Sequence, residues 1–377
     1  MLSTRTRLER AFSQNFAERG ELGASVSVWQ DGREVISLSR GWCEREEERA
    51  WNDDTLVPVY SVSKGPAAAT FLLVLREAGL TPDDLVRRVW SDLPVGDLTF
   101  LELLSHRAGL PGVMGVVEVA ERKAVVEALT ETVPFWEPGM AHGYHARSIG
   151  FLLDELCERL LGRRLGACWR EWIAEPLGLD FWIGLPESEF ARVAKLYPGR
   201  YVIRKEEKAF YEAMQTEDSL ARRAFGSLKG YQSASEMNDS AAWAGGFPAF
   251  GGVGTAKALA HFYQAVLGHT EQEVFPAEIR EQLATRLVQG PDQVLQLKTS
   301  FGAGMMFDPI VESEKLRQLF GPHQEAFGHP GAGGSHAFCD PRTGISFAYT
   351  MNQMELGLFP GNRGLDLVEA VFADLLE

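Results

Sequence analysis

Apolar and polar positions follow strand periodicity near both ends of the chain. Two β-rich runs early in the sequence are joined through Asp31-Gly32, a dipeptide favoured in tight primed turns, and they predict a β-hairpin. A second pair of runs near the C-terminus flanks a turn-forming segment from Asp340 to Gly344 and predicts another hairpin. The four predicted strands are residues 24–29, 34–39, 335–339 and 345–350.

Helical spacing of apolar residues occupies most of the remaining chain. A first helix is expected from Ser3, as its N-cap, to Gly20, as its stop signal. The final segment places Leu365, Val368, Val371, Phe372 and Leu375 on one helical face. Further helices are predicted at residues 67–78, 99–105, 119–131, 149–161, 167–173 and 256–267. Because strands lie at both ends with helices between them, the pattern favours an α+β fold, with an antiparallel sheet built from both chain ends and flanked by helices.

No internal repeat or linker interrupts the chain, so we expect one folding unit with an inserted, mainly helical lobe. Residues 1–78 and 196–377 are expected to form the α/β lobe, and residues 79–195 the helical lobe. The stretch 197–251 combines charge, glycines and aromatic side chains, a composition that suits a loop roofing a pocket. Its aromatic residues include Phe210, Tyr211, Phe225, Tyr231, Trp243, Phe247 and Phe250.

Composition narrows the classes of function. A chain of 377 residues with 45% apolar residues can build an extensive core. Its net charge of -15 repels phosphate backbones and anionic lipid, so nucleic acid and membrane surfaces are poor partners. The longest apolar stretch, 67–75, is far shorter than the roughly 20 residues of a membrane helix, and no secretory signal is visible. We expect a soluble, cytoplasmic protein, in which the mixed-charge run 44–49 is a solvated face.

Neither the cysteines nor the histidines form a recognisable metal motif. Four cysteines without CxxC pairing predict free, mostly buried thiols. His142 and His145 could begin a metal site, but no third ligand follows at a known spacing. We therefore expect no metal and no cofactor.

The first candidate for chemistry is Ser61-Val62-Ser63-Lys64, at the start of a predicted helix. Residues three apart share a helical face, so Lys64 lies within reach of the Ser61 hydroxyl. The helix N-terminus favours developing negative charge, and a desolvated lysine can accept a proton. Pro66 would clash with the carbonyl of Val62 in a regular helix, which predicts an irregular or 3₁₀ first turn. Alone the motif is a weak signal, because about one such tetrapeptide is expected by chance in a chain of this length.

The motif gains weight from a family resemblance. Tyr60 to Lys64 resembles the nucleophile segment of class C β-lactamases, serine D-peptidases and their esterase relatives, the β-lactamase and penicillin-binding-protein superfamily. The segment 103–111, Leu-Leu-Ser-His-Arg-Ala-Gly-Leu-Pro, is similar to a structural stretch of that family, so His106 is expected to be buried and hydrogen-bonded. Pro138-Gly139, Tyr144 and Ser148-Ile149-Gly150 match the segment that supplies the family's catalytic tyrosine.

The resemblance assigns roles to further residues. Tyr144, as a phenolate beside cationic Lys64, would take the serine proton and return it to the leaving group. Residues 328–334 occupy the place of the family's Lys-Thr-Gly strand, where some relatives have His-x-Gly. The backbone amides of Ser61 and Ala332 would then form the oxyanion hole. His329 would orient the Tyr144 hydroxyl, although a simple turn histidine is the alternative, and His329, Gly331 and Ala332 are expected to contact substrate.

One departure from the family pattern bears on the substrate. Most β-lactamases and D-peptidases of this family have Tyr-x-Asn where this chain has Tyr144-His145-Ala146, so an anchor for a peptide-like amide is missing. We therefore expect a carboxylesterase for short-chain esters, similar to the family VIII esterases, acting through an acyl-enzyme on Ser61. A β-lactamase, D-aminopeptidase, D-peptidase or acyltransferase with the same site is the alternative. A non-catalytic scaffold of the same fold is the alternative from another class.

Overall fold

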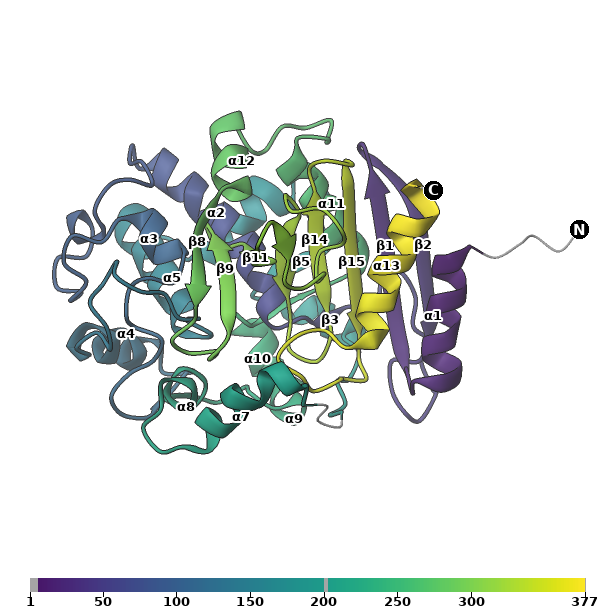
Figure 1. The fold of residues 1–377 in the computed structure, drawn as a ribbon, viewed down its shortest axis with the longest axis horizontal. Helices are drawn as coiled ribbons and strands as arrows, with labels where there is room; N and C mark the ends of the chain where they lie inside the picture. Colours follow the sequence, from purple (N-terminus) through teal and green to yellow (C-terminus); the bar gives the residue numbers. More distant parts are fainter. Residues whose placement is uncertain (1–5, 200–202, 377) are drawn as a thin grey trace, which may run out of the picture.

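The two ends of the chain meet in one antiparallel sheet. The computed structural model describes residues 6–199 and 203–376, and it contains an eight-stranded sheet in the order β2-β1-β15-β14-β13-β10-β9-β8. The N-terminal hairpin pairs with the last strand, from Ala24 opposite Met351 to Gln30 opposite Ile345 (Figure 1). The strands are β1 (Gly23–Gln30), β2 (Arg33–Gly41), β8 (Arg286–Pro291), β9 (Lys298–Gly302), β10 (Met306–Phe307), β13 (Phe327–Pro330), β14 (His336–Asp340) and β15 (Ile345–Met351). The predicted α+β class and both hairpins are confirmed.

Helices cover both faces of this sheet. Ser346 of β15 donates a hydrogen bond to Ala260 in α11 (Ala256–Leu267), whereas Tyr349 reaches Glu21, beside the terminal helices α1 (Arg7–Glu18) and α13 (Asn362–Leu376). Side chains alternate along a strand, so residues three apart lie on opposite faces. Figure 1 shows α13 in front of the sheet and α11 behind it. The N-cap of α1 is Thr6, not Ser3, which lies outside the described residues.

The predicted internal helices are present with small shifts of their ends. They are α2 (Lys64–Glu77), α3 (Phe100–Leu104), α4 (Arg122–Glu131), α5 (Ser148–Leu161) and α6 (Leu165–Trp169), which continues into a π-helical turn, Arg170–Ala174. Helix α4 begins three residues after the expected start, because the chain first forms β4 (Val117–Glu118), which pairs with β6 (Leu228–Lys229). A further helix, α12 (Ala277–Ala284), precedes β8. The boundary between two lobes stays a prediction.

The expectation of a loop over residues 197–251 is wrong in part, because short helices interrupt the stretch where the structure describes it. These helices are α7 (Lys208–Gln215), α8 (Leu220–Gly226), α9 (Ala234–Met237) and α10 (Ser240–Ala244). Polar side chains begin three of them: Ser219, Ser233 and Asp239 each accept a hydrogen bond from a backbone amide of the following turn. Such caps stabilise helices that are too short to persist on their own. The chain also contains a three-stranded sheet in the order β3-β7-β5, with β3 (Val57–Pro58), β7 (Gly252–Gly254) and β5 (Phe181–Ile183).

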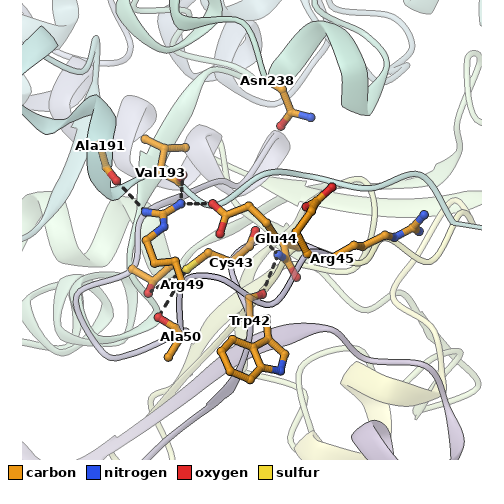
Figure 2. A network of polar contacts seen from close by, with 12 residues as sticks. Trp42, Cys43, Glu44, Arg45, Arg49, Ala50, Ala191, Val193 and Asn238 are labelled. Carbon is orange, nitrogen blue, oxygen red and sulfur yellow. Dashed lines mark hydrogen bonds and ion pairs between the residues drawn. The ribbon is translucent and has the colours of Figure 1, made fainter.

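The mixed-charge run 44–49 does more than face solvent. Arg49 pairs with Glu44, and its guanidinium donates hydrogen bonds to the backbone carbonyls of Ala191 at 2.6 Å and Val193 at 2.8 Å (Figure 2). Arg49 therefore ties the loop after β2 to a segment more than 140 residues away. Spacing along the sequence contains no sign of this contact.

Two further expectations concerned the cysteines and the lengths of the helices. All four cysteines are free and buried, as expected. In the described ranges, no helix is both long enough and apolar enough to cross a membrane.

Candidate active site

The Ser61 hydroxyl is presented by a strained turn between β3 and α2. Residues Ser61–Ser63 form a 3₁₀ turn before α2 begins at Lys64, which agrees with the irregular first turn expected from Pro66. The preceding residue, Tyr60, has φ 49° and ψ -126°, a conformation that a bulky residue adopts only under constraint. Val62, Ser63 and Lys64 are buried, whereas Ser61 is half-exposed. This turn therefore directs one serine of the motif into accessible space.

Lys64 is buried and its amine has three oxygen neighbours. Nζ lies 3.0 Å from Ser61 Oγ, 2.7 Å from the Ala146 carbonyl oxygen and 2.8 Å from the Ala249 carbonyl oxygen. Burial, followed by the charge of Arg147, lowers the pKa of Lys64 well below its usual value. Carbonyl oxygens only accept, so a neutral amine donates its two hydrogens to Ala146 and Ala249 and directs its lone pair at the Ser61 hydroxyl. This is the geometry of a general base.

Tyr144 approaches the same hydroxyl from a loop before α5. Its ring centroid lies 4.9 Å from Lys64 Nζ, and its own hydroxyl is hydrogen-bonded to the Ser61 side chain. Burial raises the pKa of Tyr144, and the bond to Ser61 only partly offsets that effect. Tyr144 therefore carries its proton at rest, unlike the phenolate expected from the sequence. The physical reason is that burial of the Tyr144 hydroxyl disfavours the charged phenolate.

His329, in β13, lies near the Tyr144 hydroxyl. Nδ1 of His329 lies 2.7 Å from the carbonyl oxygen of Pro330, so Nδ1 carries the hydrogen and donates it. Nε2 is then an acceptor, 3.5 Å from the Tyr144 hydroxyl. Burial and the neighbouring Lys64 lower the pKa of His329 to about 3, so the ring stays neutral. The distance is long for a hydrogen bond, and the Tyr144 hydroxyl has a single hydrogen, so it turns toward Nε2 only when it is not donating to Ser61.

The chain after β13 lies beside the nucleophile turn. A Cβ on Gly331 would come 2.2 Å from the Val59 carbonyl oxygen, so only glycine permits this close approach. Ala332 and Ser61 both line the same pocket. Within residues 6–199 and 203–376, neither of their backbone amides donates a hydrogen bond to another backbone group. Their role as an oxyanion hole stays a prediction, and Gly331, which packs against Val59, does not itself line the pocket.

A buried carboxylate that sequence reasoning missed holds the Tyr144 segment. Asp292 Oδ1 accepts hydrogen bonds from the backbone amides of Tyr144 at 3.1 Å and of Val294 and Leu295 at 2.8 Å each. Its Oδ2 accepts from the Thr299 hydroxyl at 2.9 Å. No motif marks Asp292, which follows Tyr144 by 148 residues, so no signal in the sequence could have found it.

The histidines around Tyr144 have structural partners. His106 is buried, as expected, and its Nδ1 accepts a hydrogen bond from the His145 backbone amide at 3.2 Å. His145 in turn lies 2.7 Å from the Gly143 carbonyl and accepts from the Leu110 amide. His142 Nε2 lies 2.9 Å from the Thr299 hydroxyl. These bonds fix the orientation of the Tyr144 loop and leave His142 and His145 engaged with protein groups.

The Ser61 hydroxyl opens into a pocket of about 530 Å³. That volume falls within the range of small-molecule sites, about 300 to 1,000 Å³. Helices α7 and α8 form part of its wall, so residues 197–251 do roof a pocket, through Phe210, Tyr211 and Phe225 but not the other aromatics named above. The lining is Ser61, Tyr144, Ile203, Phe210, Tyr211, Met214, Gln215, Phe225, Leu295, Met306, His329, Pro330, Ala332, Gly357, Leu358 and Phe359. Among the described residues, this lining contains no lysine, arginine, aspartate or glutamate.

Known proteins share this fold and these segments. The family described as Beta-lactamase matches residues 8–370 of the chain. A relative in Mycobacterium tuberculosis, esterase/beta-lactamase LipL, is 29% identical over 362 residues, which cover 92% of this chain and 80% of that protein. A penicillin-binding protein homologue from Caulobacter crescentus has a TM-score of 0.85 at 32% identity, covering 98% of this chain and 97% of its own. A family VIII carboxylesterase gives 0.84 at 31% identity, with the same coverage of both chains.

The fold, with a serine and a lysine one turn apart at the start of a helix beside an antiparallel sheet, defines a serine hydrolase of the type predicted from the sequence. The chain belongs to the β-lactamase family.

Proposed function

We propose that the protein is a carboxylesterase that hydrolyses uncharged esters, short-chain esters among them, through an acyl-enzyme on Ser61. The observation that carries the proposal is the lone-pair geometry of Lys64, whose two carbonyl partners leave Ser61 as the group that faces the free amine. Esterases among the similar proteins support the same reaction class.

In acylation, Ser61 Oγ attacks the ester carbonyl carbon and its proton passes to Lys64 Nζ. The amides of Ser61 and Ala332 stabilise the negative oxygen of the tetrahedral intermediate. The bond from carbon to the alkoxy oxygen then breaks, and the Tyr144 hydroxyl protonates the departing oxygen while Lys64 restores the tyrosine proton. The neutral ring of His329 accepts a weak hydrogen bond that keeps the Tyr144 hydroxyl in place.

In deacylation, a water attacks the acyl carbon and gives its proton to the same pair of groups. The bond between the carbonyl carbon and Ser61 Oγ breaks, Oγ regains a proton, and the carboxylic acid leaves. In each half-reaction, the proton taken from the nucleophile is thus returned to the leaving oxygen, and the base pair ends in its starting state. Neither half-reaction uses a metal or a cofactor.

The pocket favours uncharged esters over β-lactams. Penicillins and cephalosporins carry a carboxylate, and in the part of the chain that the structure describes no lysine or arginine lines the pocket to bind one. Ala146 offers no side-chain partner for a peptide-like amide, and its backbone carbonyl is engaged by Lys64. Apolar walls from Phe210, Phe225 and Phe359 instead suit the hydrocarbon part of an ester. A cytoplasmic location remains part of the proposal.

A fluorophosphonate probe followed by peptide mass spectrometry tests the nucleophile. We expect one adduct, on Ser61, and we expect Ser61→Ala to abolish both the adduct and the hydrolysis of nitrophenyl esters without lowering the melting temperature. Ser63 is the matched control: it is buried, and its hydroxyl donates to the Tyr60 carbonyl, so it should stay unlabelled. An adduct on Ser63, or faster turnover of nitrocefin than of nitrophenyl esters, would contradict the proposal.

A further inference from the structure

A buried arginine follows, in the chain, one of the two residues whose carbonyl groups bind Lys64. Arg147 is 6% exposed, and it follows Ala146 in the chain. The carbon centre of its guanidinium stacks 4.0 Å from the ring centroid of Phe250, which follows Ala249. Ala146 and Ala249 are the residues whose carbonyl oxygens accept from Lys64 Nζ. The stack therefore joins the neighbours of both acceptors, although they lie about a hundred residues apart.

The guanidinium is poorly compensated for a buried charge. One nitrogen donates to the Gly230 carbonyl, but Nε has no hydrogen-bond partner. Among the described residues, Arg147 forms no ion pair with a carboxylate, and Glu236 acts on it only through its field. Burying a cation without an ion-pair partner costs free energy. A buried guanidinium at this place therefore suggests that Arg147 has a role near the site.

We propose that Arg147 is a positioning residue for Lys64: through its stack on Phe250 it clamps the two carbonyl acceptors of the lysine amine together, and it places a fixed positive charge near that amine. The clamp sets the direction of the lone pair toward Ser61. The charge adds to burial in disfavouring the ammonium, the second cause of the lowered pKa of Lys64. The inference extends the proposed function without depending on which ester is the substrate.

Several other titratable groups surround Lys64 and Arg147 and influence their charge. Lys64 is faced by Tyr144, by the neutral rings of His106 and His329, and by Arg147. Arg147 is faced by Lys64, by the Tyr60 hydroxyl and by Glu236 at the start of α9. Burial lowers the pKa of Arg147 only to about 10, so it keeps its charge near neutral pH, and Glu236 is the carboxylate among the described residues that offsets this effect. Glu236 also accepts from the Ser233 backbone and hydroxyl, bonds that a glutamine oxygen can keep.

The test is the pH dependence of fluorophosphonate labelling at Ser61, because the labelling rate reports the free base without any assumption about substrate. Arg147→Met keeps the length and an apolar contact with Phe250 but removes the charge. Lys64 then protonates more easily, so the acidic limb of the plot of labelling rate against pH should move up by about one pH unit. At a pH on that limb, the labelling rate should fall about tenfold. Glu236→Gln removes the compensating acid and should move the limb the opposite way.

Phe250→Leu removes the stack and keeps the charge, so it should lower the labelling rate at the plateau without moving the limb upward. Arg170→Met is the matched control: in the wild type, the Arg170 guanidinium stacks 3.9 Å from the ring centroid of Trp182, outside the pocket, so neither the limb nor the plateau should change.

Two results would overturn the two parts of the proposal. If Arg147→Met folds and its acidic limb does not move, the electrostatic role is wrong. If the plateau rate of Phe250→Leu equals that of the wild type, the clamp is wrong. If Arg147→Met does not fold, a limb that stays or rises in Glu236→Gln overturns the electrostatic role. A wild-type enzyme that is not labelled at Ser61 at all would instead reject the proposed function.

Discussion

Replacing Asp292 tests how strongly a carboxylate outside every sequence motif supports the site. In Asp292→Ala, the backbone amides of Tyr144, Val294 and Leu295 lose their acceptor. Each orphaned buried amide costs about 1 to 3 kcal/mol, and the desolvation of the removed carboxylate offsets part of the total. We expect a net loss of about 3 kcal/mol in the free energy of unfolding.

Activity should fall together with stability, because the Tyr144 amide is one of the three donors and Leu295 lines the pocket. Asp292→Asn keeps an oxygen where Oδ1 lies, so it should lose only about 1 kcal/mol and retain most of kcat. Urea denaturation gives the free energies, and nitrophenyl ester hydrolysis, corrected for the folded fraction, gives kcat.

Asp308 provides the matched control for this experiment. It is another buried carboxylate, which accepts from the amides of Leu319 and Phe320 and pairs with Lys315 at 2.8 Å, but it does not line the pocket. Asp308→Ala should therefore destabilise the fold while leaving kcat per folded molecule unchanged. The reasoning fails if Asp292→Ala unfolds within 1 kcal/mol of the wild type, or if its kcat matches that of Asp308→Ala.

Further expectations concern the proton path, the substrate and the pH dependence of folding. Lys64→Ala and Tyr144→Phe should each lower kcat at least a hundredfold, and the double variant should be little worse than either, so multiplicative losses in ester assays would indicate independent roles. Ala146→Asn should raise kcat/KM for cephalosporins relative to nitrophenyl acetate by about tenfold, and an unchanged ratio would indicate that pocket shape sets the preference. Burial raises the pKa of Glu21 to about 7 from 4.5, and its partner Arg363 only partly offsets this. The contribution of Glu21 to the free energy of unfolding is therefore fully present below about pH 4.5 and is lost as the pH rises through about 7. Between those limits the wild type should lose about 3 kcal/mol more of its free energy of unfolding than Glu21→Gln does. Urea denaturation at several pH values measures both, and an equal pH dependence in the two proteins would contradict the prediction.

Local patterns in the sequence were sufficient for much of the fold and for the nucleophile. Strand runs at both ends and helical spacing between them predicted the α+β class, because side-chain periodicity depends only on local backbone geometry. The Asp31-Gly32 turn has φ values of 48° and 81°, as a primed turn requires. Ser61 and Lys64 lie within one turn of each other, so their proximity was also a local property.

Residue types and resemblance located Tyr144, His329 and Ala332, but their protonation and direction depend on the folded environment. Whether Tyr144 is a phenol or a phenolate is decided by burial, which arises from segments such as α8 and β9 that lie far away in the sequence. The hydrogen on His329 Nδ1 is assigned by the carbonyl of Pro330, a contact that only backbone conformation creates.

Tertiary structure alone decided which distant groups support the catalytic residues. Asp292 reaches Tyr144 across 148 positions, and the carbonyl of Ala249 reaches Lys64 across 185. Such contacts leave no periodic or spacing signal, because any acceptor brought to that point in space by the fold would serve. The sequence determined which chemical groups this protein can use, and the packing of the chain determined which of them carry a proton and toward which atom they point.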